Sequence, residues 1–120
     1  GIAKAAKADL ERAIELDPAA LDGSAYTSLG TLYSKVPGWP VGFGNEKKAQ
    51  SLLQEALRIN PDGIDANYFY GQFLYEHDRR TDAETYLQRA AKAPPGPGRE
   101  LADRGGPKEI AELLAKLRAK

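Results

Sequence analysis

Few residues in this chain have the types and spacing that catalysis requires. His77 is the only histidine, and a metal centre needs several ligands. We interpret His77 as a helix-end residue that favours the C-terminal dipole. The acidic pairs Asp9/Glu11 and Glu11/Glu15 lie among lysines and arginines, which is typical of a solvated helix face rather than of a general acid and base. We therefore predict no catalytic residue, no metal and no cofactor, and we expect a protein that is not an enzyme.

Two glycine-rich stretches have a composition that could hold an anion. Gly38, Gly42 and Gly44 lie close together, but the stretch lacks a Gly-Lys-Ser/Thr ending and follows no predicted strand. Residues 104–106 (Arg-Gly-Gly) precede Pro107 and would leave free N–H groups at a helix start. We interpret them as a turn with a helix cap, so neither stretch predicts a phosphate site.

Composition narrows the class of protein. The chain has 120 residues, which fits one domain, and 17 basic residues balance 17 acidic ones. This balance gives no reason to expect nucleic acid or an anionic membrane as a partner, and no stretch is long enough for a transmembrane helix. Cysteine is absent, which excludes disulfides, and methionine is absent too. We therefore expect that a leader or an upstream segment is missing and that the chain is part of something longer.

Hydrophobic periodicity predicts an all-α fold. Apolar residues recur three and four apart in alanine-rich segments. The expected helices span residues 3–16, 19–36, 46–59, 63–77, 82–92 and 107–118. Thr81 and Glu84 form a capping-box pattern, while Asp17 and Asn60, each before a proline, are expected to cap the helices that follow.

A set of small, large and small residues followed by proline recurs along the chain. The copies are Ala6-Leu10-Ala13-Pro18, Ala49-Leu53-Ala56-Pro61 and Ala83-Leu87-Ala90-Pro95. The last two are 34 residues apart, and the first two are 43 apart. Between them lie Gly30 and Gly71, which would let paired helices approach closely.

These residues resemble the tetratricopeptide repeat, a helix–turn–helix unit of about 34 residues. Tyr26-x2-Leu29-Gly30-x2-Tyr33 fits the first-helix signature, with Tyr in place of Trp, whereas Asn67 stands at the Trp position of the next repeat. The resemblance implies an α-α superhelix of about two and a half repeats. Its predicted parts are the second helix of a truncated repeat (1–18), a repeat with an insertion at 37–45 (19–61), a second repeat (62–95), and a linker with a capping helix (96–120). The apolar stripe of the last helix consists of Ile110, Leu113, Leu114 and Leu117.

The insertion breaks the repeat with proline, glycine and aromatic residues. Trp39, Val41 and Phe43 would leave an apolar patch if all three were exposed. One interpretation is that they fold back and cover an edge of the helix stack. Two others stay open: the loop contacts a ligand or partner, or it mediates self-association.

The resemblance also places a peptide-binding groove along the first helix of each repeat. Its positions are Ser24, Thr27, Thr31 and Ser34 in one repeat and Asp65, Tyr68, Gln72 and Tyr75 in the next. Co-chaperone members of the family clamp a terminal carboxylate with Lys, Asn and Arg at such positions. Here Thr27, Thr31, Tyr68 and Gln72 carry no cation, so we do not expect an acidic C-terminal peptide of the chaperone type.

The preferred hypothesis is a non-enzymatic module that binds a protein or peptide segment in this groove. The alternative is an accessory or carrier protein that binds a small apolar ligand near Trp39 and Phe43. The hypothesis of an enzyme stays open only if the missing upstream part contains a catalytic domain. Similarity to exported bacterial tetratricopeptide proteins implies a periplasmic location, with a cytoplasmic one otherwise. A weak homodimer is a further open hypothesis, because the truncated edge would expose Ile2, Leu10 or Ile14.

Overall fold

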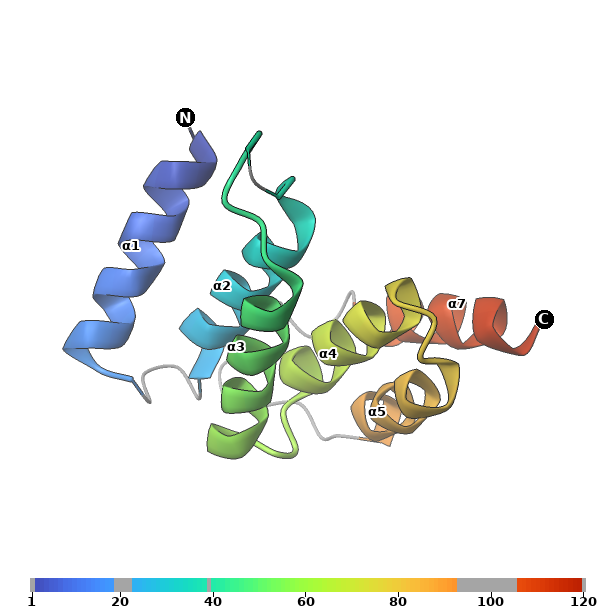
Figure 1. Ribbon diagram of the computed structural model, residues 1–120. Helices are drawn as coiled ribbons and strands as arrows, with labels where there is room; N and C mark the ends of the chain where they lie inside the picture. The colour runs from blue at the N-terminus through green and yellow to red at the C-terminus, as the bar shows by residue number, and fades with distance from the viewer. Residues whose placement is uncertain (1, 19–22, 39, 93–105, 120) are drawn as a thin grey trace. The chain divides into compact units, whose positions relative to one another are not determined.

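The computed structural model describes residues 2–18, 23–38, 40–92 and 106–119 (Figure 1). The chain divides into two compact units, Gly1–Asn60 and Pro61–Lys120. The first contains α1 (Ile2–Leu16), α2 (Ser24–Lys35) and α3 (Glu46–Ile59), and the second contains α4 (Ile64–Glu76), α5 (Arg80–Lys92) and α7 (Gly106–Arg118). The described residues form no β-strand, which confirms the predicted all-α fold. The single domain over residues 1–120 stays a prediction.

In the first unit, α2 and α3 pack along a seam of small residues. A Cβ atom added at Gly30 would lie 2.8 Å from Leu53 Cγ and 3.1 Å from the carbonyl oxygen of Ala49. Ala49, Leu53 and Ala56 are all buried. Leu53 therefore fills the space that glycine leaves open, as the repeated residue set predicts.

The second unit repeats this arrangement between α4 and α5. A Cβ atom at Gly71 would lie 2.7 Å from Leu87 Cγ and 3.3 Å from the Leu87 backbone nitrogen. Ala83, Leu87 and Ala90 are buried here in the same way. Leu87 thus occupies the position over Gly71 that Leu53 occupies over Gly30.

α1 packs against α2 but contains no buried residue. Ile2 is 92% exposed and Leu16 is 74% exposed, whereas Leu10 and Ile14 are half-buried. The exposure expected at this edge is confirmed for Ile2. The weak homodimer through the edge stays a prediction.

The start expected for the second helix, and with it the cap expected of Asp17, falls on residues 19–22, which lie outside the described residues; α2 is described from Ser24, after Gly23 with φ of +82°. The cap expected of Asn60 is wrong. Asn60 ends α3 instead of beginning α4, because its N–H donates to the carbonyl of Ala56 (2.9 Å). α4 begins after Gly63. Pro61 therefore lies outside the next helix rather than in its first turn.

A Schellman turn joins α4 to α5. Arg79 N–H donates to the Leu74 carbonyl (2.9 Å), and Asp78 N–H donates to the Tyr75 carbonyl (3.2 Å). Asp78 takes the left-handed conformation, with φ of +62°. Aspartate tolerates this conformation better than most residues other than glycine. His77 is the C-cap residue of α4, as its predicted place at a helix end requires.

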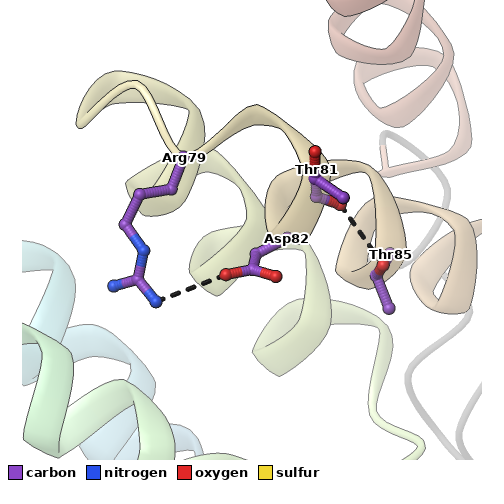
Figure 2. Close-up of polar contacts among 4 residues, drawn as sticks. All are labelled: Arg79, Thr81, Asp82 and Thr85. Carbon is purple, nitrogen blue, oxygen red and sulfur yellow. Dashed lines mark hydrogen bonds and ion pairs between the residues drawn. The ribbon is translucent and has the colours of Figure 1, made fainter.

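α5 begins at Arg80, so Thr81 lies inside the helix and the predicted capping box is wrong. The first helical hydrogen bond runs from Ala83 N–H to the Arg79 carbonyl (3.0 Å). Figure 2 shows the contacts that form instead. Arg79 Nη2 lies 3.4 Å from Asp82 Oδ2, and Thr85 Oγ1 donates to the Thr81 carbonyl (3.3 Å). The helix starts two residues earlier because the Schellman turn is short.

α7 covers the apolar side of the second unit, where it packs against α5 and α4. Its predicted stripe is buried at Ile110, Leu113, Leu114 and Leu117. Arg118 Nε lies 3.6 Å from Glu84 Oε1, which also accepts a hydrogen bond from Gln88 (3.2 Å). None of the described helices is long and apolar enough to cross a membrane.

We expect Gly71→Ala to lower the free energy of unfolding by about 1 kcal/mol. Overpacking against Leu87 costs about 1–3 kcal/mol, and the higher helix propensity of alanine offsets about 1 kcal/mol. In a Leu87→Ala background the added methyl group has room, so the same change becomes neutral or stabilising. Urea unfolding of the four proteins measures this. An equal loss in both backgrounds would show that Leu87 is not the neighbour that requires glycine.

Candidate functional site

Four predicted groove residues share one face of α4. The spacing of Asp65, Tyr68, Gln72 and Tyr75 places them on a single stripe, and each is half-buried. We call these four residues the α4 stripe. Most of the rest of the helix is buried, namely Ile64, Ala66, Asn67, Tyr70, Gly71, Phe73 and Leu74. The α4 stripe, together with half-buried Phe69 and exposed Glu76, is therefore the part of this helix that can offer polar and aromatic groups to a partner.

Tyr68 is half-buried, and its ring meets Phe69 edge-on with centroids 5.1 Å apart. Burial raises the pKa of Tyr68, and the charge and hydrogen bond of Glu109 raise it further, followed by the charges of Glu112 and Glu76. The hydroxyl thus stays protonated in negatively charged surroundings.

Tyr75, at the other end of the α4 stripe, has a cation beside it. The guanidinium carbon of Arg80 lies 5.6 Å from the centre of the Tyr75 ring. Arg80 Nη1 is buried and has no hydrogen-bond partner among the described residues. The two tyrosines of the α4 stripe therefore have neighbours of opposite charge.

The predicted positions on α2 offer less surface. Thr27 is only 5% exposed, and its carbonyl accepts a hydrogen bond from Thr31 Oγ1 (2.8 Å). Ser24, Thr31 and Ser34 are half-buried. Because α2 and α4 belong to different units, a groove that joins their faces stays a prediction. The contact of Thr27 with a partner stays a prediction as well, and little of the Thr27 side chain is accessible.

Backbone hydrogen bonds close the insertion into a compact loop. Gly44 N–H donates to the Pro37 carbonyl (2.9 Å), and Asn45 N–H donates to the Tyr33 carbonyl (3.1 Å). The N–H groups of Val41 and Gly42 both donate to the Gly38 carbonyl (3.1 Å each). The loop therefore begins and ends against the last turn of α2.

Phe43 turns back onto this helix. Its ring meets Tyr33 edge-on, with centroids 5.4 Å apart, and Lys7 Nζ from α1 lies 5.2 Å from its centre. Lys48 Nζ lies 5.0 Å from the Tyr33 ring. Val41, in contrast, is 81% exposed, so the interpretation that it folds back over the helix stack is wrong. Trp39 lies outside the described residues, and its role stays a prediction.

A family model described as tetratricopeptide repeat matches residues 41–103, which is more than half of the chain. The chain belongs to the tetratricopeptide repeat family. Tetratricopeptide repeats generally mediate protein–protein interaction and are typically not enzymes. A comparison with curated proteins finds no match. Within residues 2–18, 23–38, 40–92 and 106–119, no group of three His, Cys, Asp or Glu side chains is placed to hold a metal ion.

Within the tetratricopeptide repeat formed by α4 and α5, Asn67 takes the position of the signature tryptophan. Asn67 is fully buried, and its Nδ2 donates to the carbonyls of Pro61 and Gly63 (2.9 Å each). It thus fixes the turn that leads into α4, although its Oδ1 finds no partner in the described part of the chain. The sequence pattern marks Asn67 only as a poor match to the repeat. A small amide at the position where the repeat signature has a large aromatic residue is the signal for this structural role.

The influence of Glu109 on the pKa of Tyr68 is not predicted by the sequence pattern either. That pattern indicates only that the lysine and glutamate residues of α7 lie away from its apolar stripe. Glu109 and Glu112 lie three residues apart and are both exposed on α7. No local pattern indicates which helix they approach.

We expect Gly44→Ala to destabilise the insertion and Gly38→Ala to be tolerated. A Cβ atom at Gly44 would overlap the carbonyl oxygen of Val36, whereas one at Gly38 would lie an ordinary 3.5 Å from the Gly44 carbonyl oxygen. The expected loss in the free energy of unfolding is about 2 kcal/mol or more for Gly44→Ala, and under about 0.5 kcal/mol for Gly38→Ala. Urea unfolding, followed by the fluorescence of Trp39, measures both. Equal losses would contradict this loop geometry.

We expect Tyr68 to lose its proton at higher pH than an ordinary tyrosine. Its pKa is raised in the folded state, so the unfolded chain ionises first, from about pH 10 upward, and the folded state loses stability through that window. Ultraviolet titration of the parent and of Tyr68→Phe shows at which pH the Tyr68 phenol ionises, because the variant lacks that phenol. We expect the variant to lack a phenol that ionises at high pH. If the missing phenol ionises at a lower pH than the other tyrosines, the environment described here is contradicted.

Proposed function

We propose that this chain is a non-enzymatic interaction module that binds a polypeptide segment against the α4 stripe. Tetratricopeptide repeats generally mediate protein–protein interaction, which supports the class of partner. The observation that carries the proposal is the contrast on α4 between the half-buried face that holds the α4 stripe and a helix that is otherwise buried except at Phe69 and Glu76. Two tyrosines and an amide occupy that face.

The chemistry of the α4 stripe suits an extended segment. Gln72 carries two donors and an acceptor, which can pair with the main chain of a bound peptide. Tyr68 and Tyr75 supply large and rigid surfaces at a low cost in conformational entropy. The stripe is short, so the affinity should be modest.

Residues of the first unit offer additional contacts for a bound segment, but the proposal does not depend on them. Thr31 and Ser34 offer hydroxyl groups on α2, and Thr31 already donates within its own helix. The insertion offers Phe43, which is half-buried against Tyr33. The carrier alternative depends on Trp39, outside the described residues, and nothing described favours it over peptide binding.

A displayed library of random peptides, about twelve residues long, tests this function on the full chain. We expect the selected peptides to lose affinity about tenfold or more for a Gln72→Ala/Tyr75→Ala variant, because interface tyrosines often contribute more than 1 kcal/mol. The matched control is Thr85→Ala/Lys92→Ala, which changes two exposed positions of α5. Fluorescence anisotropy measures the dissociation constants.

Thermal unfolding of both variants shows whether the fold is intact. Selected peptides that bind the Gln72/Tyr75 variant as tightly as the parent chain would remove the α4 stripe from the proposed function. A library that yields no peptide dependent on these residues would do the same.

A further inference from the structure

Lysines from three helices gather at one end of the first unit. Consecutive helices run in opposite directions, so the start of α1, the end of α2 and the start of α3 lie around the insertion (Figure 1). We call residues 2–9, 32–38 and 40–48 the insertion end. Its acidic residues are Asp9 and Glu46, and its lysines are Lys4, Lys7, Lys35, Lys47 and Lys48. The balanced charge of the whole chain therefore contains a local excess of positive charge.

Two of these lysines lie beside one pair of aromatic rings. Lys7 Nζ lies 5.9 Å from the centre of the Tyr33 ring and 5.2 Å from that of Phe43. Lys48 Nζ lies 5.0 Å from the centre of the Tyr33 ring. Tyr33 is buried and Phe43 meets it edge-on, whereas Lys7 is half-buried and Lys48 is exposed. The rings thus hold two ammonium groups from different helices at the surface of the unit.

The acidic residues nearby in the sequence do not neutralise these two lysines. Asp9 and Glu46 each lie two residues from one of them, and side chains at that spacing do not face each other on a helix. Glu11 follows Lys7 by one turn, but such a pair is worth only about 0.3–0.5 kcal/mol, and lysine before glutamate is the weaker order. Within the described part of the chain, neither Lys7 nor Lys48 forms an ion pair. Their positive charge is therefore available to a partner.

Carboxylates suit this arrangement better than an anionic bilayer does. An ammonium group beside a ring keeps N–H donors, and a carboxylate accepts strong, charge-assisted hydrogen bonds from them. A bilayer also needs apolar groups that reach into it. Phe43 turns back onto Tyr33 instead, and Val41 is the only large hydrophobic residue that is exposed in the described part of the insertion. A segment with successive acidic residues therefore matches the insertion end best.

We propose that the insertion end binds an acidic polypeptide segment, with carboxylates of that segment paired with Lys7 and Lys48. Tetratricopeptide repeats generally mediate protein–protein interaction, which supports a polypeptide as the ligand. The site uses residues of the first unit only. It therefore goes beyond the function proposed for the α4 stripe and does not depend on it.

The test uses the full chain and a fluorescently labelled peptide of about twelve residues, in which glutamate alternates with glycine. Fluorescence anisotropy at low ionic strength measures the dissociation constant. We expect Lys7→Gln/Lys48→Gln to weaken binding about fivefold or more, because an exposed ion pair contributes up to about 1 kcal/mol. The matched control is Arg12→Gln/Arg58→Gln, which removes the same charge from exposed positions outside the insertion end and should change affinity less than about twofold.

Two further variants separate the explanations. Lys7→Arg/Lys48→Arg keeps both cations and should bind within about twofold of the parent chain, which distinguishes loss of charge from loss of fold. Gln72→Ala/Tyr75→Ala should bind the acidic peptide as the parent does, so failure of the α4 stripe would leave this proposal standing. Loss of peptide binding in that variant would overturn the proposal.

Three other results would overturn the proposal as well. The parent chain could fail to bind the peptide, or the two glutamine variants could weaken binding equally, which would indicate unspecific attraction between charges. Tighter binding to vesicles that contain phosphatidylserine, with a blue shift in the emission of Trp39, would assign the insertion end to a membrane surface instead.

Discussion

The structure depends on two glycines that have no side chain. At Gly30 and Gly71 the first helix of each pair has no Cβ atom, and a leucine of the second helix lies within about van der Waals distance of the backbone. Alanines on either side of Leu53 and Leu87 keep the helices equally close along the seam. Each unit thus has a rigid pair of helices, on which the loops and exposed faces are placed.

This packing determines what is left for binding. α4 is held by α5 along one side and by α7 along another, so few of its residues keep exposed surface. Packing against α5 brings Arg80 to the ring of Tyr75, so one end of the stripe has a cation that the sequence of α4 does not contain.

The seams could be predicted from sequence because their spacing is regular and because glycine weakens a helix unless a neighbour packs closely against it. The turn between α4 and α5 could not be predicted, since an aspartate in a sequence seldom indicates the left-handed conformation that Asp78 adopts. Thr81 also fits the pattern of a helix cap but lies inside α5. The packing of α7 against α4 and α5 joins segments that are distant in the sequence, and no local pattern encodes it. Contacts set by regular spacing were therefore predictable, whereas the geometry of the turn and the approach of α7 were not.

Amide hydrogen exchange of the intact chain tests the central claim most directly. If the seams hold each unit together, the amides of Leu53 and Leu87 exchange only when their units unfold, and they are among the slowest in the protein. Amides of the insertion, such as that of Val41, should exchange much faster. Exchange at Leu53 and Leu87 as fast as at the helix ends would contradict close packing over Gly30 and Gly71.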